Sequence, residues 1–363
     1  MSDLLYSEVE DDLRASVRAL LADRAPATAV LARTESAEPY DLKLWRTLAT
    51  ELGAAGLAVP EKLGGHGASA REVAVVMEEL GRGVVPVPFL GSAVLATSAL
   101  LAAGDIELLP RLASGEVIGA LAVPLTTWPG AAFPSSVSFS DGVLNGRTGT
   151  VADATAAEVL VVPAAGPDGP GLYTVEASAA TITEITPLDL TRRLADVAFD
   201  NAPARPIAGP GRAPAALEHA LTFGAGLLAS EQLGVAQWCL DETVAYVKQR
   251  YQFGRPVGSF QALKHRLAEE YLELVAARAA ARYAADTLAT GDADVPVAVA
   301  VAQSSCAPVA VHAAEEAVQL HGGIGMTWEH PAHLYLKRAK ADELALGTPG
   351  RHRTRLATLV NLP

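Results

Sequence analysis

The stretch Arg250-Tyr251-Gln252-Phe253-Gly254-Arg255-Pro256-Val257-Gly258 lies between two long helical patterns. Its first arginine offers planar, paired donors that suit phosphate oxygens. Phe253 adds an apolar surface, and Gly254 lets the backbone approach a ligand closely. The same residue types also occur at an ordinary helix C-terminus with a stabilising arginine and a glycine cap. The stretch therefore predicts a turn between helices, with either a phosphate-binding role or a capping role.

Long helical patterns lie on both sides of this turn. They cover about 215–251, about 260–290, a segment ending at His321-Gly322-Gly323, and about 331–345. Pro214 suits the first turn of the first helix, and the glycine pair suits a helix end. We expect the last helix to end at Gly347 and Pro349. Four such helices with short links predict an antiparallel bundle.

The two earlier regions differ from each other in pattern. Residues 1–116 read as helical, with Ser-x-x-Glu capping boxes that include Ser69 and Glu72. Residues 117–213 contain short strand-like runs at 117–123, 159–162 and 195–199, separated by Gly, Pro, Asn and Asp. The order predicts a helical enzyme with an inserted β-domain of about a hundred residues.

Composition excludes several classes of function. The chain has 363 residues and a net charge of −13, which disfavours a nucleic-acid surface or an anionic membrane as partner. The apolar stretch 220–240 contains Glu231 and two glutamines, so we expect a buried bundle helix there rather than a membrane helix. Cys239 and Cys306 lie in helical sequence and predict buried free thiols. No secretory signal opens the sequence, so we expect the cytoplasm.

The central turn, with its neighbours, resembles the Arg-x-x-Phe-Gly signature of the acyl-CoA dehydrogenases. A second stretch, Gln319-Leu320-His321-Gly322-Gly323-Ile324-Gly325, resembles that family's Gln-x-x-Gly-Gly-x-Gly turn. The loop at 56–67 and the helix containing Glu78-Glu79-Leu80-Gly81-Arg82 also resemble family segments. The resemblance thus extends over essentially the whole chain.

The resemblance implies a fold, a cofactor and its contacts. The fold is mostly α and multidomain (α+β), with an N-terminal helical domain (1–116), a middle β-barrel-like domain (117–213) and a C-terminal four-helix bundle (214–363). The implied cofactor is FAD, and in the family both turns contact the FAD of a neighbouring subunit. The residues implied to bind it are Arg250, Gln252, Phe253, Gln319, Gly322, Gly323 and Thr348.

The sequence departs from the family at the catalytic base. In many members a glutamate precedes the Gly-Thr pair and removes the α-proton of the acyl-CoA, but here that residue is Leu346. Other members place the glutamate on an earlier helix, at the position of Gly224. Both positions therefore lack a carboxylate, and we predict no catalytic residue in this chain. Glu231 is a candidate relocated base, but it lies about 10 Å of helical rise beyond Gly224, which favours a structural role.

The middle domain also departs from the family near the flavin ring. The corresponding segments are Val123-Pro124-Leu125-Thr126 and 146–151, which lack the family's Gly-Ser-Asp turn and its tryptophan. Trp128 is nearby but out of register. The residues with which the family contacts the flavin ring are therefore absent here, whereas those with which it contacts the pyrophosphate are present.

Three functional hypotheses follow. The favoured one is a base-lacking subunit of a heteromeric FAD-dependent acyl-CoA dehydrogenase, similar to actinobacterial enzymes of steroid catabolism. It would complete the FAD site of a homologous catalytic subunit in a heterotetramer, with an acyl-CoA thioester as substrate and an electron-transfer protein as acceptor. The alternatives are a self-sufficient homodimer or homotetramer with a relocated base such as Glu231, and a flavin-dependent monooxygenase relative. No metal is expected, because His330 and His333 have no further ligands at suitable spacing.

Overall fold

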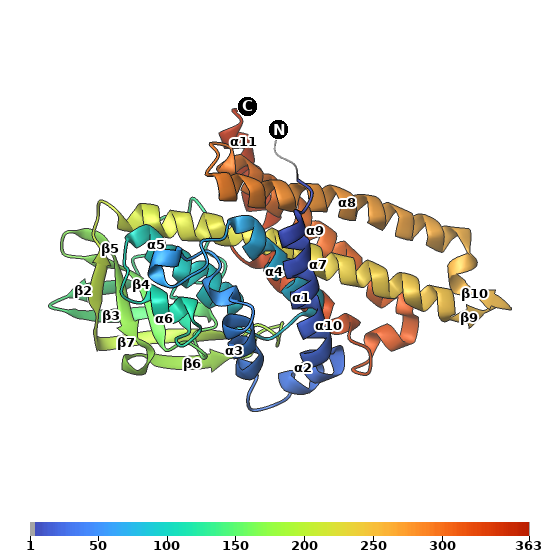
Figure 1. Cartoon of the computed structure of the whole chain (residues 1–363), viewed down its shortest axis with the longest axis horizontal. Coiled ribbons are helices and arrows are strands. Elements are labelled where there is room, and N and C mark those ends of the chain that lie inside the picture. Colours follow the sequence, from blue (N-terminus) through green and yellow to red (C-terminus); the bar gives the residue numbers. More distant parts are fainter. Residues whose placement is uncertain (1–3, 363) are drawn as a thin grey trace.

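The computed structural model describes residues 4–362 and divides into three parts along the chain. In Figure 1 the sheet lies at the left, the long helices extend to the right, and the N-terminal helices cross between them. This arrangement matches the predicted order of a helical part, a β-domain and a helical bundle.

Short helices form the N-terminal part. Their bounds are α1 Glu8–Arg24, α2 Ala27–Thr34, α3 Leu42–Thr50, α4 Ala70–Gly83, α5 Thr97–Ala103 and α6 Leu109–Ala113, with a π-helical segment, η3, at Phe89–Ala96. Capping boxes open α1 at Ser7 and α4 at Ser69, as their sequences indicate. In both, the serine accepts a hydrogen bond from the first turn while a glutamate three residues later accepts one from the serine amide. The sequence did not indicate α2.

The middle part is a single eight-stranded sheet. Its strands are β1 Gly119–Leu121, β2 Val137–Ser140, β3 Val143–Ala152, β4 Val159–Gly166, β5 Gly169–Glu176, β6 Thr181–Ile185, β7 Leu194–Pro203 and β8 Arg205–Ala208. The order is β6-β7-β3-β2-β4-β5-β8, and β1 pairs in parallel with β4. The three strand-like runs of the sequence correspond to β1, β4 and β7.

The C-terminal part contains five helices rather than four. They are α7 Ala213–Gln249, α8 Gln261–Thr290, α9 Val295–His321, α10 Ala332–Leu344 and α11 Pro349–Leu359. The predicted helix at about 331–345 is α10, which ends before Gly347 and Pro349 as expected, but the sequence did not indicate α11. Pro349 is the first residue of α11, where its fixed φ angle and missing N–H are tolerated, and Thr348 caps that helix. A two-stranded hairpin, β9 Tyr251–Gln252 with β10 Arg255–Pro256, joins α7 to α8.

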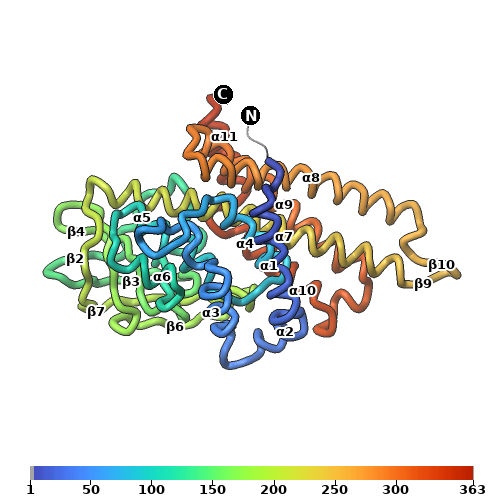
Figure 2. The backbone as a smooth tube through the Cα atoms, viewed as in Figure 1, coloured from blue at the N-terminus to red at the C-terminus, as the bar shows by residue number. Residues whose placement is uncertain are grey.

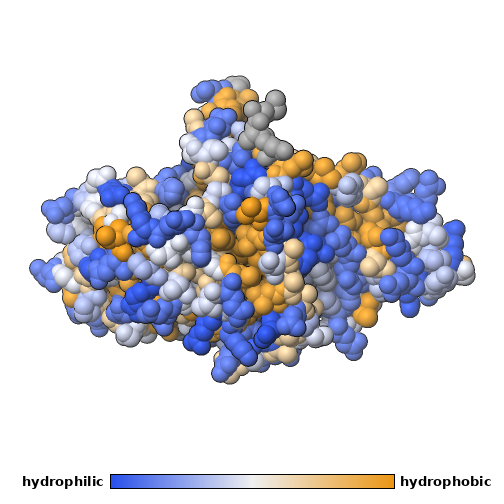
Figure 3. All heavy atoms as spheres, viewed as in Figure 1, coloured by the Kyte–Doolittle hydropathy of each residue, from blue (hydrophilic) through white to orange (hydrophobic). Residues whose placement is uncertain are grey.

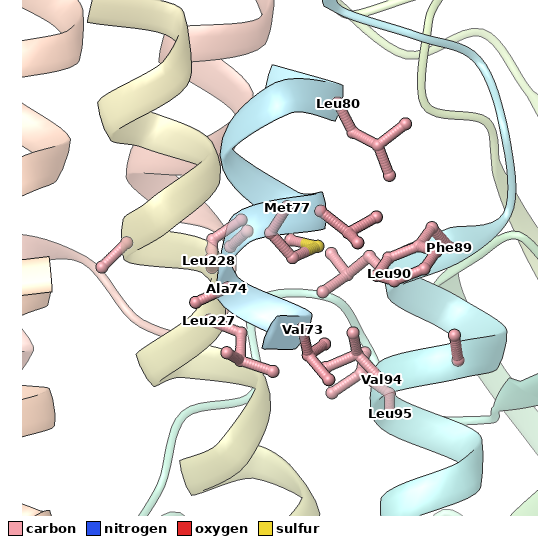
Figure 4. Close-up of a cluster of buried hydrophobic side chains, with 14 of the residues drawn as sticks. Val73, Ala74, Met77, Leu80, Phe89, Leu90, Val94, Leu95, Leu227 and Leu228 are labelled. Atoms are coloured by element: carbon pink, nitrogen blue, oxygen red, sulfur yellow. The ribbon is translucent and has the colours of Figure 1, made fainter. Parts of the chain in front are cut away.

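Helix α7 is the longest element and links the three parts. Figure 2 shows it running from the sheet to the β9–β10 hairpin at the far right. It packs against α4 so closely that a Cβ at Gly234 would overlap the carbonyl oxygen of Glu78 on α4. In the same crossing, a Cβ at Gly81 would overlap the carbonyl oxygen of Glu231. Figure 4 shows the core beside this crossing, where Met77 of α4 points toward Leu90 of η3 and Leu228 of α7 lies beside α4.

Apolar surface is distributed unevenly. Figure 3 shows apolar side chains exposed along α8 at the upper right, where Leu272 is 67% and Val275 40% exposed. The segment Val295–Met326 is long and apolar enough to cross a membrane, but 61% of its apolar window is buried inside the chain. Burial of this kind is typical of a core helix, and length with composition is weak evidence for a membrane span.

Candidate active site

The two positions where the family carries its base meet at one point. Leu346 follows α10, and Gly224 lies in α7, yet a Cβ built on Gly224 would be 3.1 Å from Leu346 Cδ1. That Cβ would also overlap a methyl group of Leu95 from η3. Leu346 is 0% exposed and Leu95 is 3% exposed. Three apolar elements therefore fill the point at which a carboxylate would be expected.

The backbone at this point is strained and firmly held. Leu346 has a φ of 52°, a left-handed conformation that is uncommon for a residue with a bulky side chain. Its amide donates a 2.7 Å hydrogen bond to the carbonyl of Leu125. Its carbonyl lies 3.0 Å from Nε2 of the buried His352. The loop thus keeps a tightly fixed geometry of the kind found at functional sites, although its side chain is inert.

A small apolar pocket lies beside Leu346, between the sheet and α10. Its volume is about 250 Å³. Leu125, Thr126 and Thr150 line it from the two middle-domain segments that the sequence aligned with flavin-ring contacts. Leu344 and Lys340 line it from α10. The structure therefore brings together the segments that the resemblance assigns to the flavin ring.

Glu231 lies in a buried ionic network. Its carboxylate accepts two 2.7 Å hydrogen bonds from Arg192 Nη2 and one of 2.6 Å from Arg338 Nη1. Arg338 also pairs with Asp189 at 2.5 Å, and Arg192 pairs with Asp342 at 2.6 Å. All five side chains are buried. The network ties the loop before β7 to α7 and α10.

The two acids of this network that face Arg192 have pKa values shifted in opposite directions. Burial alone would raise the pKa of Glu231, but Arg192 and Arg338 outweigh it and hold that pKa below its ordinary value. Burial, and next the charge of Glu231, raise the pKa of Asp342 well above its ordinary range. An acid held ionised by two arginines is a weak proton acceptor, which favours the structural role for Glu231.

The β9–β10 hairpin presents its predicted ligands to the outside. Arg250, Gln252 and Phe253 are all exposed, and the Phe253 side chain is 91% exposed at a φ of 55°. Among residues 4–362, no carboxylate forms a salt bridge with Arg250. An added Cβ on Gly254 would meet nothing within 4 Å. The hairpin thus offers a free guanidinium, an apolar ring and an open backbone.

The glycine turn lies next to the helix that carries this hairpin. The ring of Tyr246, one turn before the end of α7, stacks on that of His321 with centroids 4.3 Å apart. Gln319 is exposed, and a Cβ on Gly322 or on Gly323 would meet nothing within 4 Å. The two signature turns are therefore connected through this stacked pair.

These residues suit a phosphate-bearing cofactor such as FAD. Arg250 and the open glycine backbone could hold the pyrophosphate, with Gln319 beside the adenosine half. Because all of them are exposed in the single chain, a second chain is needed to enclose the ligand. Thr348 lies elsewhere, at the start of α11, which Figure 1 places at the top of the view and far from the hairpin.

Comparison with known proteins agrees with this geometry. Residues 7–116 match the N-terminal domain of acyl-CoA dehydrogenases, and residues 214–360 match their C-terminal domain. The chain belongs to the acyl-CoA dehydrogenase family. It is therefore an FAD-dependent oxidoreductase of the class that acts on CH–CH bonds, as the two signature turns predicted.

Individual relatives have informative names. The chain is 38% identical to acyl-CoA dehydrogenase IpdE2 of Mycolicibacterium smegmatis over 96% of this chain and 98% of that protein. A variant of the Tcur3481-Tcur3483 steroid ACAD is 31% identical, with a TM-score of 0.86 and 98% of each chain covered. The ChsE4-ChsE5 complex of Mycobacterium tuberculosis is 27% identical, with a TM-score of 0.88 and 100% of each chain covered.

Proposed function

We propose that this chain is the base-lacking subunit of a heteromeric acyl-CoA dehydrogenase. The observation that carries the proposal is the packing at Leu346, Gly224 and Leu95, which leaves the place of the base apolar and closed. General-base catalysis typically contributes about 10²–10⁴-fold to a rate, and no apolar side chain supplies it. In contrast to this closed point, the exposed residues Arg250, Phe253, Gln319, Gly322 and Gly323, which we call the cradle, are open to a ligand. This contrast supports a role for the chain in the FAD site of a neighbouring subunit.

The proposed partner is a homologous catalytic subunit, in a heterotetramer. Bound FAD would supply the hydride acceptor for oxidation of an acyl-CoA, and the partner would supply the carboxylate that removes the α-proton. This chain would contribute Arg250, Gln252, Phe253, Gln319 and the Gly322-Gly323 turn to the partner's FAD. The relatives named as a steroid ACAD and as the ChsE4-ChsE5 complex support a steroid-derived acyl-CoA and a two-chain assembly. We further expect a cytoplasmic location and an electron-transfer protein as acceptor.

The test compares the chain alone with the chain co-expressed with its candidate partner. We expect little flavin on the isolated chain and no bleaching of its visible spectrum when an acyl-CoA is added without oxygen. The complex should bind flavin and be bleached. If the isolated chain binds flavin and an acyl-CoA bleaches it, this chain has its own base and the proposal is wrong.

A variant tests the direction of the contribution. Arg250→Gln in this chain, with an unaltered partner, should lower the flavin content of the complex while the complex remains assembled. The matched control is Arg46→Gln, which removes another exposed arginine on α3. Equal flavin content in both variants would mean that this hairpin does not hold the cofactor.

A further inference from the structure

Three side chains with metal-binding atoms meet beside the glycine turn. Glu242 comes from α7, His321 is the last residue of α9, and His330 lies in the loop before α10. One donor atom from each lies within 4.8 Å of the other two. Nε2 of His330 is 4.0 Å from Oε1 of Glu242, and the two imidazole rings have centroids 4.2 Å apart.

The hydrogen bond of His321 fixes which nitrogen is available. Its Nδ1 lies 2.6 Å from the carbonyl oxygen of Ala317, and because a carbonyl only accepts, Nδ1 carries the proton. The lone pair is therefore on Nε2. His321 is 3% exposed, and its Nε2 has no hydrogen-bond partner within the described part of the chain, residues 4–362. A histidine whose other nitrogen donates to a backbone carbonyl is the usual arrangement for a metal ligand.

No other cation occupies the cluster. Among residues 4–362, Glu242 makes no ion pair apart from the 4.0 Å approach of His330. The nearby basic groups face elsewhere. Lys337 lies over the ring of Trp328 at 4.2 Å, and His333 packs edge-on against the same ring at 4.5 Å. The carboxylate of Glu242 thus faces two imidazoles without a lysine or arginine paired to it among the described residues, and the cluster presents three donor atoms.

We propose that Glu242, His321 and His330 form a binding site for a divalent transition-metal ion, with Zn²⁺ as the best match. Two imidazoles and one carboxylate are a common zinc ligand set, with a fourth position left for water. Bonds of about 2.1 Å in a tetrahedral site place ligand atoms about 3.4 Å apart. The three side chains therefore need to close by roughly 1 Å, from separations within 4.8 Å.

Ligation has one local cost. Nδ1 of His330 accepts a 3.2 Å contact from the amide of Ala332. Binding through Nε2 would move the proton to Nδ1 and give up this contact. The net contribution of a single hydrogen bond of that length is small beside the free energy of metal binding at a structural zinc site.

The proposed metal site lies between the two signature turns. Tyr246 stacks on His321 and belongs to the last turn of α7, directly before Arg250. A metal held by Glu242 and His321 would fix the end of α7 against the turn that begins at Gly322. It would thereby set the spacing between the two signature turns. The sequence did not suggest the site, because it pairs His330 with two residues from other helices rather than with nearby His333.

The experiment uses the full-length chain, without a histidine tag and stripped of metal by chelator dialysis. Co²⁺ is the probe, because a low-coordinate Co²⁺ ion has an intense visible absorption band that Zn²⁺ abolishes by displacement. We expect one Co²⁺ per chain. His330→Gln and Glu242→Gln should each weaken binding by at least about 10-fold, the lower end of losses seen even for residues that only support a ligand.

Two histidine variants serve as matched controls. His333→Gln alters the neighbour that faces Trp328, and His312→Gln breaks an exposed His–Glu pair with Glu273 on α8. Both should bind Co²⁺ like the unaltered chain, and circular dichroism should show every variant folded. The proposal is overturned if millimolar Co²⁺ gives no such band. It is also overturned if the band survives in His330→Gln and Glu242→Gln, or if His333→Gln or His312→Gln removes it.

Discussion

The buried network around Glu231 allows two substitutions of the same kind to be set against each other. Glu231→Gln removes a carboxylate that accepts three hydrogen bonds of 2.6–2.7 Å from two buried arginines. The new amide group would also point a donor at a guanidinium donor. Removing one partner of a buried ion pair typically costs about 3–5 kcal/mol.

Part of that loss should be recovered inside the network. Burial and the charge of Glu231 are the two leading causes that raise the pKa of Asp342. Without Glu231 that pKa should fall, and the carboxyl of Asp342 would then pair more strongly with Arg192, to which it is already bonded at 2.6 Å. We therefore expect Glu231→Gln to lower the free energy of unfolding by about 3 kcal/mol. For a chain of 363 residues, that corresponds to a fall in the melting temperature of roughly 4 °C.

Asp342→Asn is the matched substitution. It also replaces a buried acid by its amide, but the pKa of this acid is raised, so its proton is lost less readily, and an amide oxygen can accept the same bond from Arg192. We expect a loss of about 1 kcal/mol or less. The assay is thermal unfolding at pH 7 followed by circular dichroism. Equal losses in the two variants would refute the opposite pKa directions of the two acids, and a fully stable Glu231→Gln variant that had lost only turnover would make Glu231 a catalytic base.

Three further predictions address packing, pH and the thiols. Gly234→Ala should lower the free energy of unfolding by at least about 2 kcal/mol, because the added Cβ would overlap the backbone of α4. Gly209→Ala is the control and should change stability little, because its Cβ would meet nothing within 4 Å. Equal melting temperatures of the two variants would contradict the close crossing of α4 and α7. Burial, then Glu316, raises the pKa of Glu270 to about 8, so the folded chain holds a proton that the unfolded chain loses near pH 4.5. Between pH 4.5 and about pH 8, the free energy of unfolding should fall by up to roughly 1.4 kcal/mol per pH unit because of this group. Urea titrations at several pH values should show this dependence in the unaltered chain and in the Glu269→Gln control, and Glu270→Gln should remove it. Cys239 and Cys306 are buried, and burial raises the pKa of each thiol. A thiol reagent should therefore label neither cysteine in the native chain and both after unfolding. Rapid labelling of the native chain would contradict this packing.

Local features of the fold were predictable from sequence because their causes are local. A serine followed three residues later by a glutamate supplies both halves of a capping box, and α4 begins where Ser69 and Glu72 indicate. Helix α11 was not predicted, because a proline that follows the end of one helix is equally compatible with the start of the next. Only the packing of the following residues decides between the two.

Features of the candidate site could be predicted from sequence only where the interacting residues lie close together along the chain. Leu346 and Gly224 could be named separately, but their contact, and the role of Leu95 in closing it, depend on three elements packing together. Glu231 carried no signal for its partners, which lie 39 residues away at Arg192 and 107 residues away at Arg338. An apolar residue such as Leu95 in an apolar run gives no sequence signal for a function.

The geometry of α7 itself supports an assignment of the exposed cradle to another chain's flavin. Gly224 and Arg250 are joined by continuous helix up to Gln249. At 1.5 Å of rise per residue, they are separated by about 39 Å along the helix axis. One FAD cannot lie with its ring beside Gly224 and its pyrophosphate at Arg250 of the same chain. The cradle therefore suits a cofactor whose ring lies in a neighbouring subunit, and closure of the point beside Leu346 leaves that contribution intact.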